Sequence, residues 1–234
     1  MKVVFDMDTG VDDSLALIYA LNRPAYEIQG IGCVYGNVES WLAAENTMKI
    51  LDLVNAPDIP VVIGANEPLT GKWAGRVSII HGSERKPFDK GIEEFYLETA
   101  ERLQGEMVLI TVGPLTNIAR TIKKYPQFVK LVKHMYMMGG TLSMRGNVSP
   151  VAEANVACDP VAADYVFQSG MKITAVGLDV TMKVRFKRAY LDWIQTHCRP
   201  ELKRAAEYLG KAFEWYFMGN QDRNYCMDDS PLHD

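Results

Sequence analysis

The sequence predicts an α/β fold in which helices cover both faces of a mainly parallel, open β-sheet. Short apolar segments rich in β-branched residues alternate with longer segments of helical periodicity as far as about residue 179. Polar motifs follow the ends of several of these strands, and no repeat or low-complexity linker interrupts the alternation. Parallel strands joined by helices bind ligands at their carboxyl ends. We therefore expect a functional site where the polar motifs gather.

The individual strands and helices follow from the apolar runs and from the residues that interrupt them. Strands are expected at residues 3–5, 28–34, 59–63, 107–112, 134–138 and 173–176. Helices are expected at residues 14–21, 39–54, 93–103 and 115–123, after the Asp159-Pro160 pair, and at residues 190–194 and 201–217. Gly113-Pro114 ends the fourth strand, and Pro160 suits the first turn of a helix. The stretches 65–90 and 219–229 are polar and are expected to form loops.

Length, composition and charge exclude several classes of protein. The 234 residues suit one large domain or two small ones, and one domain is the simpler expectation. A content of 48% hydrophobic and 23% charged residues argues against disorder. The net charge is −4 and no Lys/Arg block is present, so nucleic acid is not an expected partner. With no apolar run long enough for a signal peptide or a membrane span, and with four scattered cysteines, we expect a cytoplasmic protein with free thiols.

Four aspartates lie within eight residues at the first strand-to-helix turn, namely Asp6, Asp8, Asp12 and Asp13. Clustered carboxylates repel one another and are costly to bury, so such a group favours a bound cation. Oxygen ligands favour Ca²⁺ or Mg²⁺ over zinc. Alternatively, Asp12 caps the helix and Asp13 interacts with its dipole while the others are solvated. That alternative accounts for one or two such residues better than for four.

The residues around these aspartates resemble two known families. Val4-Phe5-Asp6-Met7-Asp8-Thr9 is similar to the short opening motif of haloacid dehalogenase-like phosphohydrolases. The longer segment DMDTGVDDSLAL, residues 6–17, resembles the opening of the nucleoside hydrolases over its whole length. Further similar motifs occur in the same order at residues 36–38, 112–119, 138–140, 153–155, 158–160 and 233–234. On these collinear motifs the chain is identified as a member of the inosine-uridine preferring nucleoside hydrolase family.

This resemblance implies a Rossmann-like nucleoside hydrolase fold and a Ca²⁺ site. The cation would be held by the carboxylates of Asp8, Asp13 and Asp234 and by the backbone carbonyl of Val112. Asp8 would be the general base, and His233 would protonate the departing base. Asp6 would support the ligands from behind. The remaining residues implied to contact the substrate are Asp12, Asn37, His81, Met138, Asn147, Glu153, Asn155, Gln221 and Tyr225.

The function implied by the resemblance is Ca²⁺-dependent hydrolysis of the N-glycosidic bond of ribonucleosides, giving ribose and free base in purine or pyrimidine salvage. Relatives form homodimers or homotetramers, and the same is expected here. The chain departs from the family pattern at Thr9, at Ala154 and in ending on Asp234, whereas relatives continue further. We therefore expect a single nucleoside hydrolase-like domain over residues 1–234 that lacks the C-terminal part of the family fold, in a truncated or incomplete form.

Two alternatives remain at this stage. A Mg²⁺-dependent haloacid dehalogenase-like phosphohydrolase would use Asp6 as nucleophile and Asp8 as acid and base, but it explains only the first motif. A protein that binds Ca²⁺ or a nucleoside without catalysis is the second alternative. The products formed from nucleosides and phosphomonoesters distinguish these readings.

Overall fold

Six parallel strands form the central sheet of the computed structural model, which describes residues 1–73, 83, 85–219 and 225–227. The strand order is β3-β2-β1-β4-β5-β6. The strands are β1 Lys2–Met7, β2 Glu27–Cys33, β3 Val61–Ile63, β4 Met107–Thr111, β5 Val132–Met138 and β6 Ile173–Val176. The order reverses between β1 and β4, the position at which sheets of this kind bind ligands. The predicted α/β class with a mainly parallel sheet is confirmed.

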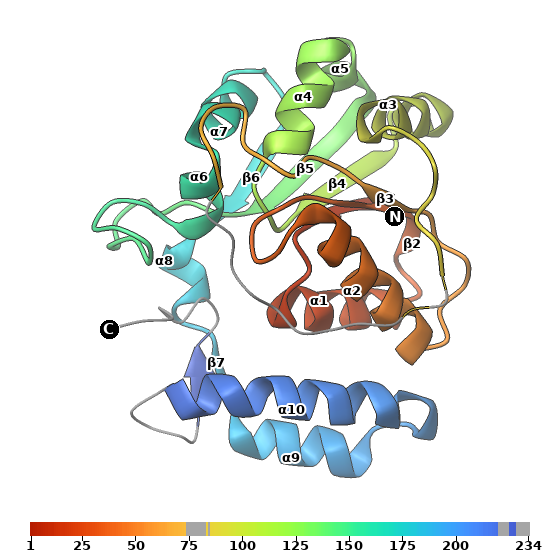
Figure 1. The fold of residues 1–234 in the computed structure, drawn as a ribbon, viewed down its shortest axis with the longest axis vertical. Coiled ribbons are helices and arrows are strands. Elements are labelled where there is room, and N and C mark those ends of the chain that lie inside the picture. Colours follow the sequence, from red (N-terminus) through yellow and green to blue (C-terminus); the bar gives the residue numbers. More distant parts are fainter. Residues whose placement is uncertain (74–82, 84, 220–224, 228–234) are drawn as a thin grey trace.

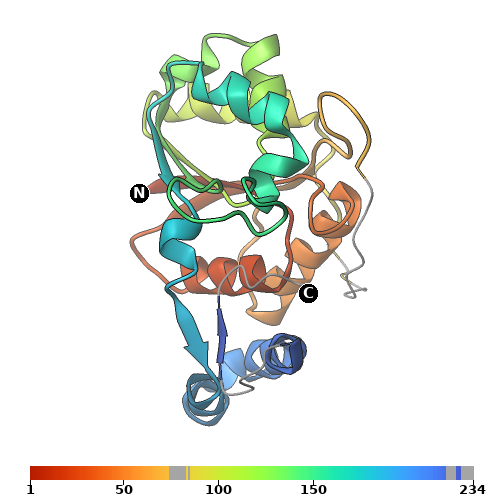
Figure 2. The same cartoon turned by 90° about the vertical axis from the view of Figure 1, so that its left-hand side faces the viewer.

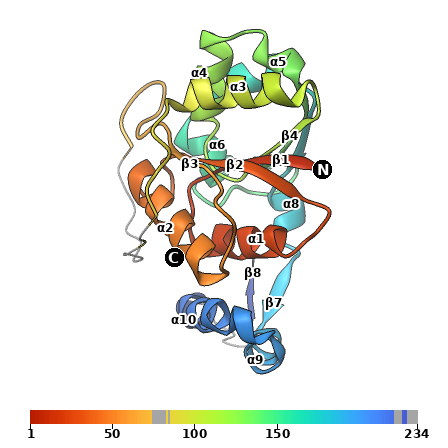
Figure 3. The ribbon, with the colours of Figure 1, turned by 90° about the vertical axis from the view of Figure 1, so that its right-hand side faces the viewer.

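Helices cover the two faces of the sheet with separate hydrophobic cores, as Figures 2 and 3 show. One face carries α1 Val11–Leu21 and α2 Ser40–Leu53. The other face carries α3 Ile92–Leu103, α4 Thr116–Lys124, α5 Phe128–Leu131 and α7 Pro160–Phe167. Along β1 the side chains alternate, so that Phe5 and Met7 enter the first core and Val4 enters the second. Asp6 and Asp8, in phase with Val4, therefore lie on the α3 face of the sheet.

The part of the chain beyond β6 extends the α1 side of the molecule. It contains α8 Leu178–Thr181, β7 Arg185–Lys187, α9 Arg188–His197, the 3₁₀ turn η1 Pro200–Leu202, α10 Lys203–Gly219 and β8 Tyr225–Met227. Helix α10 lies beneath α1 and α2 in Figure 1, and Leu209 and Phe213 join their core. No helix in the described ranges is both long and apolar enough to cross a membrane.

The structure adds six short elements that the sequence did not predict, namely α5, α6 Ala154–Cys158, α8, η1, β7 and β8. Helices α5 and α6 are four and five residues long. Strand β8 lies within the expected polar loop 219–229 and pairs antiparallel with β7. Elements of three to five residues contain too few positions to show a period, so pairing and capping determine them instead.

Substituting Leu109 with alanine tests the second core. Leu109 is fully buried on β4, so Leu109→Ala should lower the free energy of unfolding by about 2–5 kcal/mol. Leu142, which is 98% exposed, is the matched control, and Leu142→Ala should change it by less than about 0.5 kcal/mol. Urea denaturation followed by circular dichroism measures both changes. Equal effects of the two substitutions would contradict this assignment of the core.

Candidate functional site

The carboxyl end of β1 and the start of α1 bring the aspartates together. Asp6 and Asp8 are 1% and 2% exposed, and Asp13 is also buried. Gly10 is the N-cap residue of α1, and its N–H donates to Asp13 Oδ2 at 2.7 Å. The alternative in which Asp12 caps the helix is therefore wrong, because Asp12 lies inside the first helical turn, where it is exposed to solvent.

The loop after β2 binds two of these carboxylates through one residue. The backbone N–H of Asn37 donates to Asp8 Oδ2 at 2.6 Å, and its side-chain Nδ2 donates to Asp13 Oδ2 at 3.3 Å. The preceding residue must be glycine, because a Cβ at Gly36 would overlap the Asp8 carboxylate. Asn37 thus holds the end of β1 against the start of α1.

Burial and crowding make negative charge at this site costly. Burial, with added repulsion from Asp12 and Asp6, raises the pKa of Asp8 to about 8. Burial and the charges of Asp8 and Asp12 likewise raise the pKa of Asp13 well above its usual range. Asp8 Oδ1 is buried and has no hydrogen-bond partner among the described residues. The cluster therefore needs either protons or a cation.

The end of β4 supplies a backbone carbonyl beside this cluster. The N–H of Val112 donates to the carbonyl of Asp6 at 2.9 Å, which ties the two strand ends together. A Cβ at Gly113 would lie 3.1 Å from Asp8 Oδ1, so this backbone passes close to the carboxylate oxygen that has no partner. The Val112 carbonyl accepts from Asn155 Nδ2 at 3.1 Å and retains a second lone pair.

Four further predicted site residues gather at the end of β5. Glu153 caps α6 by accepting from the N–H groups of Asn155 at 2.7 Å and Val156 at 3.1 Å, and it also accepts from Gly140 N at 2.8 Å. Asn147 Oδ1 accepts from Ala154 N at 3.0 Å. Asn155 Nδ2 also reaches the Met138 carbonyl at 3.2 Å. These side chains hold the backbone of residues 138–156 in place, and Asn155 joins that segment to Val112.

The other predicted site residues are not placed by the structure. Four of them lie outside the described residues, namely His81, Gln221, His233 and Asp234. Tyr225 belongs to β8, and only its backbone is described. Within the described ranges, no group of three His, Cys, Asp or Glu side chains is arranged to hold a metal ion. Of the predicted ligand set, the described ranges contain the carboxylates of Asp8 and Asp13 and the carbonyl of Val112.

Polar residues beneath the site were not assigned by the sequence analysis. Tyr96 and Asn117 are fully buried and donate to the Asp6 carboxylate. Asp159 is buried, accepts from Thr116 Oγ1 at 2.7 Å, and caps α7 through Ala162 N. Asn117 and Asp159 stand in motifs that resemble the family, which was the available signal. Tyr96 carries no such signal, because its neighbours on α3 read as an ordinary amphipathic helix.

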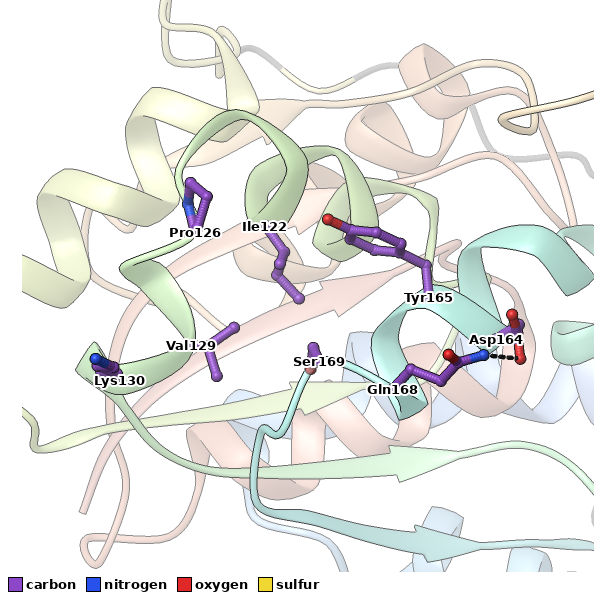
Figure 4. Close-up of a pocket in the computed structure, with 8 residues that line it drawn as sticks. All are labelled: Ile122, Pro126, Val129, Lys130, Asp164, Tyr165, Gln168 and Ser169. Carbon is purple, nitrogen blue, oxygen red and sulfur yellow. Dashed lines mark hydrogen bonds between the residues drawn. The ribbon is translucent and has the colours of Figure 1, made fainter.

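A surface hollow between α4, α5 and α7 is separate from the aspartates. Figure 4 shows its lining, which includes Ile122, Val129 and Tyr165, together with Asp164 accepting from Gln168 Nε2 at 2.7 Å. It lies at the C-terminal ends of α4 and α7, which in a parallel α/β fold face the opposite edge of the sheet from the strand carboxyl ends. We therefore do not assign this hollow to the site.

The loop that carries Asn147 is held by Asp179, and this can be tested. Asp179 accepts from the Ser143 hydroxyl and from the backbone N–H groups of Leu142 and Ser143, which lowers its pKa. Asp179→Ala should therefore speed amide hydrogen exchange at residues 142 and 143, because both amides lose their charged acceptor. Exposed Asp192 is the control, and Asp192→Ala should leave these rates unchanged. Unaltered exchange rates in Asp179→Ala would show that contacts other than those of Asp179 hold the loop.

Comparison with known proteins agrees with the resemblance found in the motifs. Residues 3–234 match the family model described as inosine-uridine preferring nucleoside hydrolase. Uridine nucleosidase 1 of Arabidopsis thaliana is 38% identical over 195 residues, which are 79% of this chain and 58% of that protein. The non-specific ribonucleoside hydrolase RihC of Klebsiella pneumoniae is 32% identical over 98% of this chain and 76% of that protein.

Solved structures of the same kind share the fold. A plant nucleoside hydrolase has a TM-score of 0.89 and 29% identity, over 98% of this chain and 76% of that chain. The purine-preferring ribonucleoside hydrolase from Gardnerella vaginalis has a TM-score of 0.87 and 30% identity, over 99% and 78%. The chain thus spans about three quarters of these structures and 58% of the Arabidopsis relative. The protein belongs to the inosine-uridine preferring nucleoside hydrolase family.

Proposed function

We propose that this protein hydrolyses the N-glycosidic bond of ribonucleosides to give ribose and free base, with Ca²⁺ as its cofactor. The observation that carries the proposal is the environment of Asp8. Its carboxylate is buried beside Asp13 and the β4 end, and one of its oxygens has no partner among the described residues. In a member of the nucleoside hydrolase family, such a carboxylate fits a site for a cation and a sugar.

The donors at this site suit Ca²⁺ in kind. Asp8, Asp13 and the Val112 carbonyl are oxygen donors, which hard cations prefer, and Asp234 would complete the set. The raised pKa values of Asp8 and Asp13 reflect a deficit of positive charge that a divalent cation would remove. When bound, the cation supplies positive charge that holds vicinal ribose hydroxyls and lowers the pKa of a water molecule.

The roles proposed for the protein's own residues come from the family resemblance, and for the residues that the structure describes they agree with the positions given above. Asp8, whose Oδ1 has no hydrogen-bond partner among the described residues, takes the proton of the attacking water. Asp12 and Asn37 on one side, and Asn147, Glu153 and Asn155 on the other, orient the ribose through its hydroxyls. The carboxylates stabilise the positive charge that develops on the sugar as the base departs. His233 protonates that base, and His81, Met138, Gln221 and Tyr225 complete the substrate contacts.

For the substrate we propose a chemical class, and for the assembly we propose a homo-oligomer. Relatives are named for uridine, for purine nucleosides and for ribonucleosides without specificity, so we propose ribonucleosides as the class. A homodimer or homotetramer in the cytoplasm is proposed from the family resemblance and from the scattered cysteines.

The phosphohydrolase alternative is disfavoured by the surroundings of Asp6. That mechanism needs Asp6 as an accessible nucleophile, but Asp6 is 1% exposed. Both of its carboxylate oxygens already accept hydrogen bonds, from Tyr96 at 2.8 Å and from Asn117 at 3.3 Å. A buried carboxylate with both oxygens engaged is poorly placed to attack a phosphate.

The proposed function can be tested by product analysis with inosine, uridine and cytidine. The protein should release free base and ribose, and a Ca²⁺ chelator should abolish that release until Ca²⁺ is restored. Asp8→Asn should lower kcat by about 10²–10⁴-fold, because it removes the base that accepts the proton. Asp164→Asn, on the distant hollow, is the matched control and should retain full activity.

Three results would oppose this proposal in different ways. Release of inorganic phosphate from a phosphomonoester without nucleoside cleavage would favour the phosphohydrolase. Nucleoside binding without turnover would favour a non-catalytic role. Activity that persists in the chelator would remove Ca²⁺ from the mechanism.

A further inference from the structure

A buried polar network lies directly behind the aspartate cluster and includes a residue of α3. The Tyr96 hydroxyl donates to Asp6 Oδ2 at 2.8 Å, and Asn117 Nδ2 donates to Asp6 Oδ1 at 3.3 Å. All three side chains are at most 1% exposed. Asn117 also accepts from Ala65 N at 2.8 Å and donates to the Cys33 carbonyl at 3.3 Å. The network therefore connects β1 with α3, α4 and the ends of β2 and β3.

The neighbouring backbone is shaped to admit these two donors. A Cβ at Gly32 on β2 would overlap the Tyr96 hydroxyl. A Cβ at Gly64, just after β3, would overlap the Asn117 amide. Two glycines thus leave space for the polar ends of two side chains that reach the same carboxylate. Simple packing of α3 on the sheet would not require a hydroxyl at this point, since phenylalanine fills the same volume without a polar atom to satisfy.

Asp6 is joined to both parts of the proposed cation site. Asp6 lies on β1, and Asp8 directly follows the last residue of that strand, so movement of one carries to the other. Its carbonyl accepts from Val112 N at 2.9 Å, which fixes the residue whose own carbonyl is a proposed ligand. The position of Asp6 therefore helps to set the separation between the Asp8 carboxylate and the Val112 carbonyl.

We propose that Tyr96 is a positioning residue for the cation site, acting through Asp6 to hold Asp8 and Val112 at the spacing that the cation needs. This inference rests on the proposed function and names a residue that the function did not use. Without the hydroxyl, the buried Asp6 carboxylate loses one of its two side-chain donors. The carboxylate then shifts to regain a partner, and β1 moves with it. Outer partners of this kind commonly change metal affinity by about 10–100-fold.

Calorimetric titration of the chelator-treated protein with Ca²⁺ tests the proposal without relying on activity. Tyr96→Phe keeps the ring and removes only the hydroxyl, and it should raise the Kd for Ca²⁺ by about tenfold or more. Tyr125→Phe is the matched control, because the Tyr125 hydroxyl donates to the Glu94 carboxylate at 3.1 Å at the surface between α3 and α4. It should change the Kd by less than about twofold.

A second control separates positioning from general stability. Phe95 is buried beside Tyr96 on α3 and lies against Gly30 instead of Asp6. Phe95→Leu should lower the thermal midpoint of the metal-free protein and leave the Kd for Ca²⁺ within about twofold. If the Kd follows the thermal midpoint across all these variants, Tyr96 is a structural residue only and the proposal is wrong.

A double-mutant cycle tests the route through Asp6. Once Asp6→Ala has removed the carboxylate, adding Tyr96→Phe should weaken Ca²⁺ binding no further, so the two effects should be strongly non-additive. Additive effects would show that Tyr96 acts by another route. If Tyr96→Phe does not fold, Asp6→Asn replaces it. This variant keeps the shape of the Asp6 side chain and removes the negative charge that accepts the hydrogen bonds from Tyr96 and Asn117. An unchanged Kd in Asp6→Asn would overturn the proposal.

Ca²⁺ binding by the unaltered protein distinguishes failure of the positioning role from failure of the proposed function. If it binds Ca²⁺ and Tyr96→Phe binds it equally well, the positioning role fails and the proposed function stands. If the unaltered protein does not bind Ca²⁺, the proposed cofactor fails, and with it the positioning role.

Discussion

Burial of negative charge at the end of β1 is the constraint on which the rest of the site depends. Two unit charges about 4 Å apart repel by about 4 kcal/mol at an effective dielectric constant of about 20. A hydrogen bond to a charged group contributes only about 1.5–3 kcal/mol. The two bonds from Asn37 to Asp8 and Asp13 are therefore comparable with the repulsion alone, and they leave the cost of burying the charges unmet. The residual deficit appears as raised pKa values, and a divalent cation is the simplest group that removes it.

The fold provides three features that make this burial feasible. Strands β1 and β4 are adjacent where the strand order reverses, so the Asp8 carboxylate and the Val112–Gly113 backbone meet at one edge. Gly10, the N-cap residue of α1, donates its N–H to Asp13, and the first helical turn is favourable for an acidic residue. Glycine at position 36 allows the loop after β2 to approach Asp8 within hydrogen-bonding distance. Each feature lies at the end of a strand or at the start of a helix, so the sheet determines its position.

Much of this arrangement was predictable, because its signals are local in the sequence. The six central strands and the longer helices follow from apolar runs, and all six strands were found within a few residues of their expected bounds. The clustering of Asp8, Asp13 and Asn37 followed from their positions after consecutive parallel strands. Tyr96 was not predictable, because its contact with Asp6 spans 90 positions of the chain and nothing near it marks a polar role. The capping of α6 by Glu153 was likewise missed, because a five-residue helix shows no period.

The spacing of Asp6 and Asp8 explains how one short motif can resemble two enzyme families that catalyse different reactions. Residues two apart on a strand share a face and differ in depth by about 6.6 Å, from a rise of about 3.3 Å per residue. In this protein the sheet still covers Asp6, where Tyr96 and Asn117 engage both of its oxygens. Asp8 lies at the edge, where, among the described residues, the Asn37 N–H donates to Oδ2 and Oδ1 has no partner. A nucleophilic role would require the deeper carboxylate to be accessible. The network around Asp6 instead engages both oxygens of the deeper carboxylate, and the shallower carboxylate of Asp8 keeps Oδ1 for the proposed cation.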